Sequence, residues 1–278
     1  MDVVNLERRA FVLRTTRRFF DERGFVEVET PVRIAAPAPE CHIDCPPVAT
    51  GGFLRASPEL QMKKLLASGM ERIYQIGPCF RDGERGSRHS PEFTMLEWYR
   101  RGATCREIAD DLSALLGTLG LAESSAFTRL SVRDAYIRYA GWDPWAEWNQ
   151  DRFDFDMATK VELAIREAGG GVFLEGYPPE AASLALVRGG VAERWEFYWE
   201  GVELANCFTE LCDRDEQLRR FEEARKERRA LGEADYPIDR EFIDMVSMME
   251  SAAGVALGVD RLVMAITGAK SISDVRVQ

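Results

Sequence analysis

An alternating segment limits the possible folds of this chain more than any other feature. In an extended strand, successive side chains point to opposite faces, so residues 93–100 would place an aromatic ring, a carboxylate and a phenol on one face. The side chains on that face are Phe93, Met95, Glu97 and Tyr99. Arg81 ends an apolar segment just upstream. The pattern predicts a β-hairpin with strands at 73–81 and 93–100, a polar loop at 82–92, and one face built for binding. The alternative, a hairpin with a solvated polar face, has little use for an exposed phenylalanine or methionine.

Length and composition fit a globular protein. The 278 residues suffice for one large domain or two small ones, and 46% apolar with 30% charged residues is ordinary for a soluble protein. No apolar run approaches the roughly 20 residues that span a bilayer, and the N-terminus lacks the layout of a signal peptide. We therefore expect a cytoplasmic protein with no membrane partner. The net charge of −11 argues against extended contact with a nucleic-acid backbone.

The six cysteines do not indicate a disulfide framework, because they are scattered through a long chain. Two of them belong to the segment Cys41-His42-x-x-Cys45, which resembles half of a zinc site. Structural zinc usually needs four ligands in paired clusters, and the sequence holds no second pair and only one further histidine, His89. Ordinary thiols in a proline-rich loop are the better interpretation.

Helix and strand signals follow one another with no repeat, low-complexity segment or clear linker. Capping signals at Ser57, Thr104 and Asp213 mark helix starts. The expected helices cover 3–23, 57–69, 104–119, 131–140, 157–168, 213–231 and 242–249, with a last one from Asp260. The expected strands cover 25–28, 53–56, 73–81, 93–100, 183–187, 195–199, 202–211 and 254–259. Because strands outnumber parallel-type crossovers, we expect one α+β domain over 1–278, built on a mostly antiparallel sheet. Residues 141–168 carry no functional signal.

A second group of polar residues surrounds a tight turn at Glu200-Gly201, which joins the strands 195–199 and 202–211. Glu196 and Glu203 flank the turn, a usual way to present two carboxylates to a hard cation that also binds phosphates. Downstream, strict alternation gives one face to Asn206, Phe208 and Glu210. Glu203 is out of phase with them, so the strand needs a bulge or Glu203 has another role. Taken alone, the two carboxylates at the turn are better interpreted as solvated side chains.

The segment 254–264, GVALGVDRLVM, combines small residues with an arginine. Small residues let a backbone approach a ligand closely. Arg261 lies in the first turn of the following helix, where the macrodipole disfavours a cation; a bound anion would explain this position, and a surface arginine is the alternative. Arg81 and Arg261, an acidic pair for Mg²⁺ and the Phe93 ring together suit a nucleoside triphosphate. The chain has neither a P-loop nor a Rossmann fingerprint.

These motifs resemble those of class II aminoacyl-tRNA synthetases, and specifically of the lysyl type. FVEVETP, ending at Pro31, resembles their motif 1, FRDGERGSRHSPEFTMLEWY their motif 2 and GVALGVDRLVM their motif 3, while GVELANCFTEL matches the strand of the lysyl-type amino-acid pocket. The resemblance covers nearly the whole chain. It implies a class II catalytic domain with an antiparallel sheet flanked by helices, ATP and Mg²⁺ as cofactors, and a homodimer formed through motif 1.

The chain begins almost at the motif 1 helix, so we expect no anticodon-binding OB-fold. Within the family it is most similar to the short bacterial members that attach (R)-β-lysine to a lysine of elongation factor P. The resemblance implies two-step ligation, in which lysine or (R)-β-lysine is activated as an adenylate and then transferred to elongation factor P. Charging of tRNA is one alternative, disfavoured by the acidic charge and the missing module, and a catalytically silent regulatory subunit is another.

The resemblance also implies roles for particular residues. Arg81 and Arg261 would be catalytic, and Glu196 and Glu203 would bind Mg²⁺. The implied ATP site consists of Arg81, Asp82, Glu84, His89, Phe93, Glu196, Glu203 and Arg261. The implied amino-acid pocket consists of Glu59, Arg81, Glu97, Tyr99, Asn206, Phe208, Glu210 and Ala256.

Three positions depart from the family pattern. Gly83 stands where motif 2 usually has the glutamate that reads adenine, so Asp82 or Glu84 would take that role. Ala256 replaces a glycine of the lysyl-tRNA synthetases, as in the short members, and its methyl group is expected to reshape the pocket and disfavour α-lysine. Cys207 replaces the glycine of an A-N-G-F pattern, which predicts a narrower pocket floor.

Overall fold

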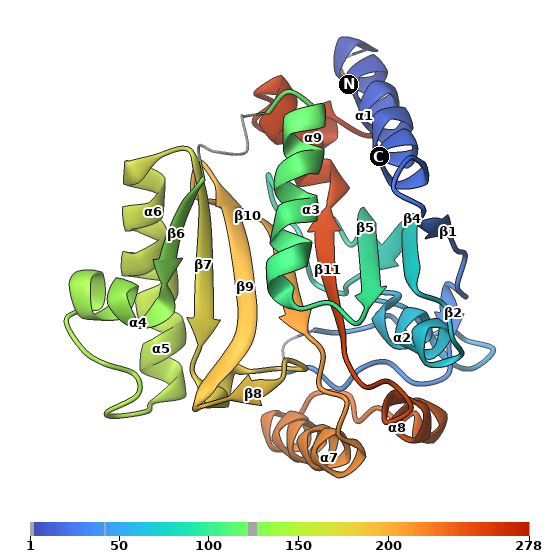
Figure 1. Ribbon diagram of the computed structural model, residues 1–278, viewed down its shortest axis with the longest axis vertical. Helices are drawn as coiled ribbons and strands as arrows, with labels where there is room; N and C mark the ends of the chain where they lie inside the picture. The colour runs from blue at the N-terminus through green and yellow to red at the C-terminus, as the bar shows by residue number, and fades with distance from the viewer. Residues whose placement is uncertain (1–2, 42, 122–126, 278) are drawn as a thin grey trace.

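The computed structural model describes residues 3–41, 43–121 and 127–277, and over these residues the protein is built on one large sheet (Figure 1). Its nine described strands follow the order β1-β4-β5-β11-β10-β9-β7-β6, with β8 paired to β9. Only the pairs β1–β4 and β6–β7 among them are parallel. The strands are β1 (Val26–Glu27), β4 (Arg72–Phe80), β5 (Glu92–Arg101), β6 (Thr128–Ser131), β7 (Gly171–Tyr177), β8 (Val187–Arg188), β9 (Val191–Trp199), β10 (Val202–Thr209) and β11 (Ala252–Gly258), and a separate small pair joins β2 (Arg33–Ile34) to β3 (Phe53–Leu54). The predicted mostly antiparallel α+β sheet is confirmed.

The predicted hairpin, β4 and β5, lies between the edge strand β1 and the central strand β11. β4 and β5 pair from Arg72 opposite Arg100 to Phe80 opposite Glu92, and β11 pairs along the other side of β5. Gly254 of β11 lies opposite Tyr99, where an added Cβ would come within 2.0 Å of the tyrosine ring. A glycine is therefore required at this position for the ring to lie against the neighbouring strand.

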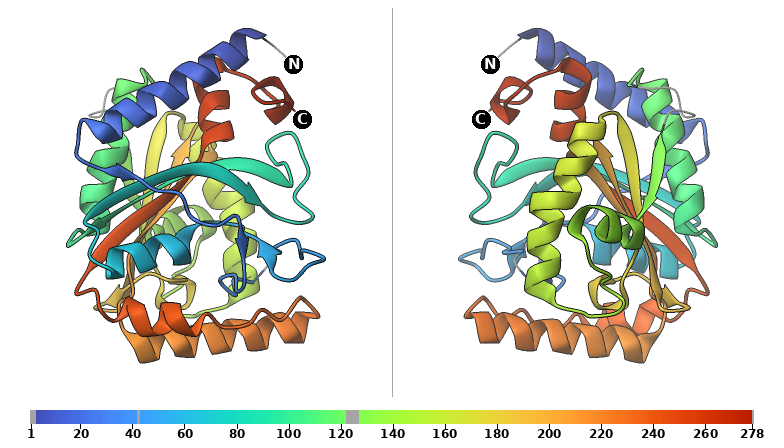
Figure 2. Two further views of the ribbon diagram at one scale, coloured as in Figure 1. Left: turned by 90° about the vertical axis from the view of Figure 1, so that its right-hand side faces the viewer. Right: turned by 90° about the vertical axis from the view of Figure 1, so that its left-hand side faces the viewer.

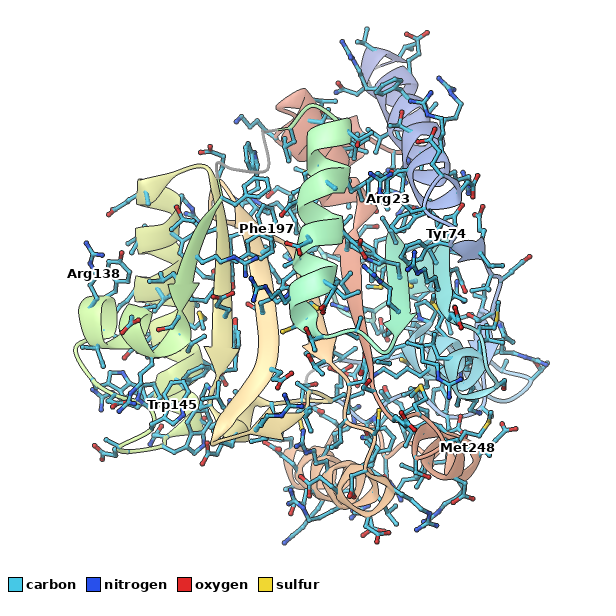
Figure 3. All side chains as sticks on the ribbon, viewed as in Figure 1. Arg23, Tyr74, Arg138, Trp145, Phe197 and Met248 are labelled. Atoms are coloured by element: carbon cyan, nitrogen blue, oxygen red, sulfur yellow. The ribbon has the colours of Figure 1, made fainter. Side chains whose placement is uncertain are left out.

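Three helices cover one face of the sheet (Figures 1 and 2): α1 (Val3–Asp21), α3 (Cys105–Thr118) and α9 (Val259–Thr267). The predicted capping box starts α3, since Thr104 and Glu107 exchange side-chain and backbone hydrogen bonds. Apolar side chains of these helices meet those of the central strands in the largest core cluster. Phe197 of β9, labelled in Figure 3, is fully buried in this cluster.

The remaining helices pack at the two ends of the sheet. A continuous helical stretch packs with β7 and β9. It consists of α5 (Gln150–Asp156), the π-helical turn η3 (Met157–Val161) and α6 (Glu162–Ala168). The short helix α4 (Val132–Ala135) and the π-helical turn η2 (Tyr136–Ala140) precede it in the chain. At the opposite end, α2 (Glu59–Ala67), α7 (Arg214–Leu231) and α8 (Arg240–Val246) share a third cluster. The short 3-10 turns are η4 (Pro179–Ala181) and η5 (Ile272–Asp274). Within the described residues, none of the helices has the length and apolarity to span a membrane.

Some predicted elements differ from the structure. The strand expected at 183–187 is wrong over most of its length, because residues 183–186 turn and make an isolated bridge between Ala185 and Glu210, and only Val187 belongs to a strand, β8. Instead β7 pairs with β9, although no strand was expected at 171–177. Gly169 and Gly170 adopt positive φ of 71° and 70°, so the turn they form ends just as the strand begins. The helix expected at 157–168 begins earlier, at Gln150.

Candidate active site

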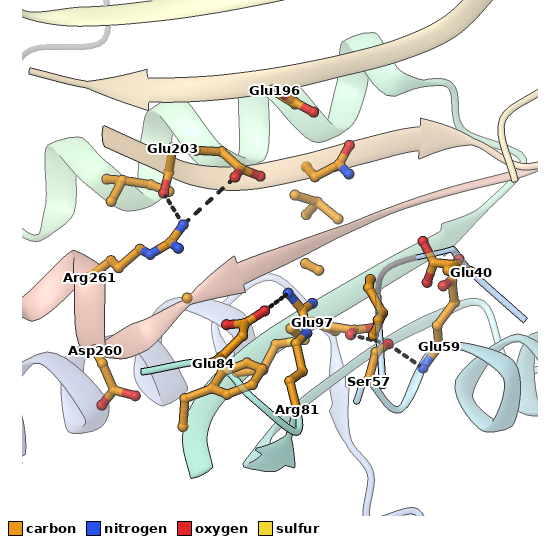
Figure 4. Close-up of a pocket in the computed structure, with 18 of the residues that line it drawn as sticks. Glu40, Ser57, Glu59, Arg81, Glu84, Glu97, Glu196, Glu203, Asp260 and Arg261 are labelled. Carbon is orange, nitrogen blue, oxygen red and sulfur yellow. Dashed lines mark hydrogen bonds and ion pairs between the residues drawn. The ribbon is translucent and has the colours of Figure 1, made fainter. Parts of the chain in front are cut away.

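The charged residues singled out by the sequence meet in one cavity of about 470 Å³, on the sheet face away from α3 (Figure 4). Nearly all of the predicted residues line it: Glu59, Arg81, Glu84, His89, Phe93, Glu97, Tyr99, Glu196, Glu203, Asn206, Phe208, Glu210, Ala256 and Arg261. Asp82 does not line the cavity; its side chain is exposed and accepts a hydrogen bond from the Gly83 N–H. Arg81 and Arg261, which are far apart in the sequence, thus face the same space.

A β-bulge explains how Glu203 reaches the cavity. β10 pairs regularly with β9 on either side of a register shift between Glu203 and Ala205. A bulge was one of the two predicted explanations for Glu203 being out of phase with the alternating residues downstream. The shift lets Glu203 face the cavity together with Asn206. Cys207, by contrast, points to the other face and is fully buried in the main core. The prediction that Cys207 narrows the pocket floor is therefore wrong, because alternation places it on the opposite side of the strand.

Arg261 occupies the end of the cavity nearest α9. Its guanidinium donates a hydrogen bond of 2.9 Å to the Glu203 carbonyl oxygen and lies 3.7 Å from the Glu203 carboxylate. The Nη2 atom also lies 2.5 Å from Nε2 of His89. Burial, and then the positive charge of Arg261, lower the pKa of His89, so its imidazole is neutral at pH 7 and can contact an anion without adding charge. This end of the cavity suits the outer phosphates of a nucleotide.

Arg81 lies beside the aromatic ring expected to hold a base. Its guanidinium carbon is 5.2 Å from the centre of the Phe93 ring, and Nη1 is 3.4 Å from Glu84. The Arg81 Nε atom is buried without a hydrogen-bond partner in the described structure, so it has a donor to spare for a ligand. Glu84 lines the cavity whereas Asp82 does not, which favours Glu84 as the carboxylate that replaces the family glutamate at Gly83.

Behind the opposite end of the cavity lies a buried cation, Lys63, which was not predicted from the sequence. Lys63 of α2 lies 2.6 Å from the Glu59 carboxylate and 2.5 Å from that of Glu210. The Lys63 and Glu210 side chains are only 2% and 1% exposed. Glu59 and Lys63 are four residues apart on one helix, a spacing that predicts a local ion pair; only the fold could add Glu210 to it.

Glu97 is held separately by two hydroxyl groups. Ser57 donates to it over 2.6 Å and Tyr99 over 2.8 Å. The Ser57 hydroxyl also accepts from the Glu59 N–H, and the helix begins at Glu59, two residues after the predicted capping residue Ser57. Burial, and then the charge of Glu59, raise the pKa of Glu97 to about 7. Burial also raises the pKa of Glu210 to about 8, although Lys63 opposes the shift. This end of the cavity has more carboxylates than cations, which suits a ligand that carries ammonium groups.

A second missed residue, Arg194, lies two positions before Glu196 on β9. It donates to the Glu196 carboxylate over 2.5 Å and to the Asn206 side chain over 3.3 Å. Its guanidinium also covers the Tyr177 ring at 4.3 Å. The contact could have been predicted from the sequence, because residues two apart on a strand, such as Arg194 and Glu196, lie on the same face.

The carboxylates predicted to bind Mg²⁺ have a fitting donor set. Burial, and then the neighbouring Glu196 carboxylate, raise the pKa of Glu203 to about 7, so the pair would be stabilised by a cation between them. The described residues form no cluster of three metal-binding side chains. Mg²⁺ commonly binds through one or two carboxylates together with phosphate oxygens, and two carboxylates beside a phosphate site meet that requirement.

Comparison with known proteins agrees with this site. The family model described as tRNA synthetases class II (D, K and N) matches residues 3–277. The chain belongs to this family. Three curated relatives named elongation factor P–(R)-β-lysine ligase each align with 98% of this chain and 94% of their own length. They come from Yersinia enterocolitica (38% identical over 308 residues), Proteus mirabilis (37% over 311) and Photorhabdus laumondii (38% over 307).

Two features of this class II synthetase domain concern residues outside the ATP site. Ala256 lies opposite Glu97 in β5 and Asn206 in β10, so its methyl group lies among the side chains of the amino-acid pocket. In the possible zinc segment, Cys41 and Cys45 are free thiols, and Cys41 contacts the carbonyl oxygen of Ala224. His42 lies outside the described residues.

Proposed function

We propose that this protein is an ATP-dependent ligase that activates lysine or (R)-β-lysine as an adenylate and transfers it to a lysine side chain of elongation factor P. One observation supports the proposal most. One cavity contains two kinds of charged surface. Arg81 and Arg261 line a part suited to phosphates, and the carboxylates of Glu59, Glu97 and Glu210 line a part suited to ammonium groups. The names of the curated relatives give the acceptor and the amino acid.

The two ends of the cavity hold the two substrates. Phe93 would stack on adenine and Glu84 would accept from its amine, while Arg261 and the neutral His89 contact the outer phosphates. The ammonium groups of the amino acid would bind the carboxylates of Glu97 and Glu210, which are already buried and held by hydrogen bonds or ion pairs. The amino-acid carboxylate would then lie beside Arg81, which lines the same cavity.

The first step then needs positioning and charge stabilisation more than a protein nucleophile. The amino-acid carboxylate attacks the α-phosphorus of ATP, the bond to the bridging oxygen breaks, and pyrophosphate leaves. Arg81 stabilises the charge that develops on the α-phosphate, and Arg261 that on the leaving group. Glu196 and Glu203 would hold Mg²⁺, which supplies further charge neutralisation of the phosphates when bound.

In the second step an uncharged lysine ε-amine of the acceptor attacks the carbonyl carbon of the adenylate. The carbon–oxygen bond to the phosphate breaks, AMP leaves with the electron pair, and the amine proton passes to water. The product is an amide. The acceptor loses one amine proton and gains the aminoacyl group, and no oxidant or further reactant is required.

The proposal includes a location and an assembly. We place the reaction in the cytoplasm and expect a single catalytic domain without a tRNA substrate, which the net charge of −11 supports. We also expect a homodimer through α1 and β1, as the family resemblance implied. Apolar side chains there are exposed, among them Phe11 at 46% and Val26 at 51%, which supports a surface covered by a second copy.

The deciding experiment measures pyrophosphate exchange with α-lysine and with (R)-β-lysine, followed by transfer of the labelled amino acid to purified elongation factor P. We expect exchange with at least one of the two, and a stable amide on the factor. Transfer to purified tRNA instead of the factor would favour a tRNA-charging enzyme. No exchange with either amino acid would indicate a silent paralogue and overturn the proposal.

A further inference from the structure

A second cavity of about 740 Å³ adjoins the ATP site. Its walls come from the loop at 39–41, from β7 and β9, from the helical stretch of α5 and η3, and from one face of α7. Four side chains line both cavities: Glu40, Arg194, Glu196 and Glu203. The second cavity therefore reaches the ATP site at the carboxylate pair of Glu196 and Glu203. The helical stretch of α5 and η3, which carries no functional signal in the sequence, forms part of its wall.

The lining of this cavity is acidic, with apolar side chains between the charges. Its three arginines are already engaged: Arg194 with Glu196, Arg219 with Glu223, and Arg220 with the carbonyl oxygen of Ser183. In the described structure, the carboxylates of Glu40 and Glu180 have no salt-bridge partner. The apolar part of the lining consists of Phe153, Met157, Leu184 and Phe221.

A buried hydroxyl group also faces this cavity. Tyr177 is only 2% exposed, and its hydroxyl lies beside the Glu196 carboxylate. The hydroxyl oxygen nevertheless has no hydrogen-bond partner with good geometry among the described residues. A buried polar atom without a partner is unusual in a folded protein, and here it is located where the second cavity meets the ATP site.

We propose that this second cavity is the passage by which the acceptor protein's lysine side chain reaches the adenylate. The inference rests on the proposed function. A lysine side chain is a flexible four-carbon stem with a cationic end, so the apolar walls would cover the stem and the carboxylates would attract the end. The Tyr177 hydroxyl would accept a hydrogen bond from the arriving nitrogen. The ammonium group first loses a proton to water; the resulting amine forms the new C–N bond as the C–O bond to AMP breaks, and its second proton passes to water.

Ala224 of α7 offers a way to block this passage without touching the ATP site. It lines the second cavity only, and Ala224→Trp would fill space there. Glu180→Lys would reverse a charge on the same lining. Matched controls are Ala230→Trp and Glu222→Lys, because both residues lie on α7, are exposed and line neither cavity.

Three rates separate activation from delivery of the acceptor: pyrophosphate exchange, hydroxamate formation with hydroxylamine, and transfer to elongation factor P. Hydroxylamine is small enough to reach the adenylate without the passage. We expect both cavity variants to keep the first two rates within twofold and to lose at least tenfold in kcat/KM for the factor, while the controls keep all three.

Normal transfer to elongation factor P in Ala224→Trp would overturn this inference and leave the proposed function intact. An equal fall in all three rates in both cavity variants would also overturn it, because the cavity would then serve activation. Failure of exchange or transfer in the unaltered protein would refute the proposed function, and the inference with it.

Discussion

Replacing Lys63 with methionine tests the internal cation of the amino-acid pocket. Methionine keeps most of the volume and removes the charge, so Glu59 and Glu210 would lose a partner at 2.6 and 2.5 Å. Breaking a buried ion pair by removing one partner costs about 3–5 kcal/mol. Lys64→Met is the matched control on the next residue of α2. Lys64 pairs with Asp239, which is 13% exposed, and with Glu241, which is 73% exposed, so we expect a smaller loss than for Lys63→Met.

The expected loss is large enough to measure by thermal unfolding. Unfolding entropy near 60 °C is about 2.1 cal/mol/K per residue, or about 0.6 kcal/mol/K for a chain of 278 residues. A loss of 3–5 kcal/mol would then lower Tm by about 5–9 °C at pH 8. Urea unfolding gives the same quantity as a change in midpoint without a change in slope.

The loss should depend on pH in a defined direction. Lys63 has a raised pKa in the folded protein, so its own contribution is fully present below the unfolded pKa of about 10.4 and is lost only above it. Glu210, with its pKa raised to about 8, binds a proton in the folded state that an unfolded carboxyl releases near pH 4.3. The contribution of Glu210 to the free energy of unfolding therefore falls as pH rises from about 4.3 to about 8. We expect this fall to be steeper in Lys63→Met. As pH is lowered from 8 to 5.5, the free energy of unfolding of Lys63→Met should therefore rise towards that of the unaltered protein.

Two results would refute this reasoning. One is a loss below about 1 kcal/mol at pH 8, which would mean that the carboxylates find other partners or water. The other is a loss that stays constant from pH 8 to pH 5.5, which would mean that the stranded carboxylates do not take up protons.

Further predictions concern catalysis, binding and assembly. Arg81→Ala should lower pyrophosphate exchange by about 10²–10³-fold, as for loss of a major charge-stabilising donor, and near-normal exchange would exclude its catalytic role. Because the pKa of Glu97 is about 7 and an ammonium ligand needs its ionised form, lysine affinity measured by calorimetry should fall by up to about tenfold per pH unit below 7; a flat profile from pH 8 to 5.5 would contradict this. Glu84→Gln should raise the KM for ATP while Asp82→Asn leaves it unchanged, and equal effects would remove the distinction between them. Phe11→Asp should shift the protein toward the monomer in sedimentation analysis, and an unchanged mass would place the interface elsewhere.

The elements of the fold that could be predicted were those with strong local signals. The hairpin around Arg81 and the capping box at Thr104 depend on residues a few positions apart, and both are confirmed. The bulge near Glu203 could also be inferred, because a strict period of two made the residue out of phase. The strand at 171–177 was missed because its opening glycines indicate a turn and its apolar residues fit either a strand or a buried loop. Its place is decided by pairing with β9.

The sequence by itself determined the chemistry available at each position: arginines for phosphates, alternating carboxylates on strands, and a small-residue segment before a helix. The tertiary structure decided which of these groups share a cavity and in what charge state. Lys63 and Glu210 meet although 147 positions separate their numbers, and Arg194 neutralises a carboxylate expected to be free for a metal. The reason is physical. Burial and long-range ion pairing depend on contacts between distant segments, and such contacts leave no periodic signal in the chain.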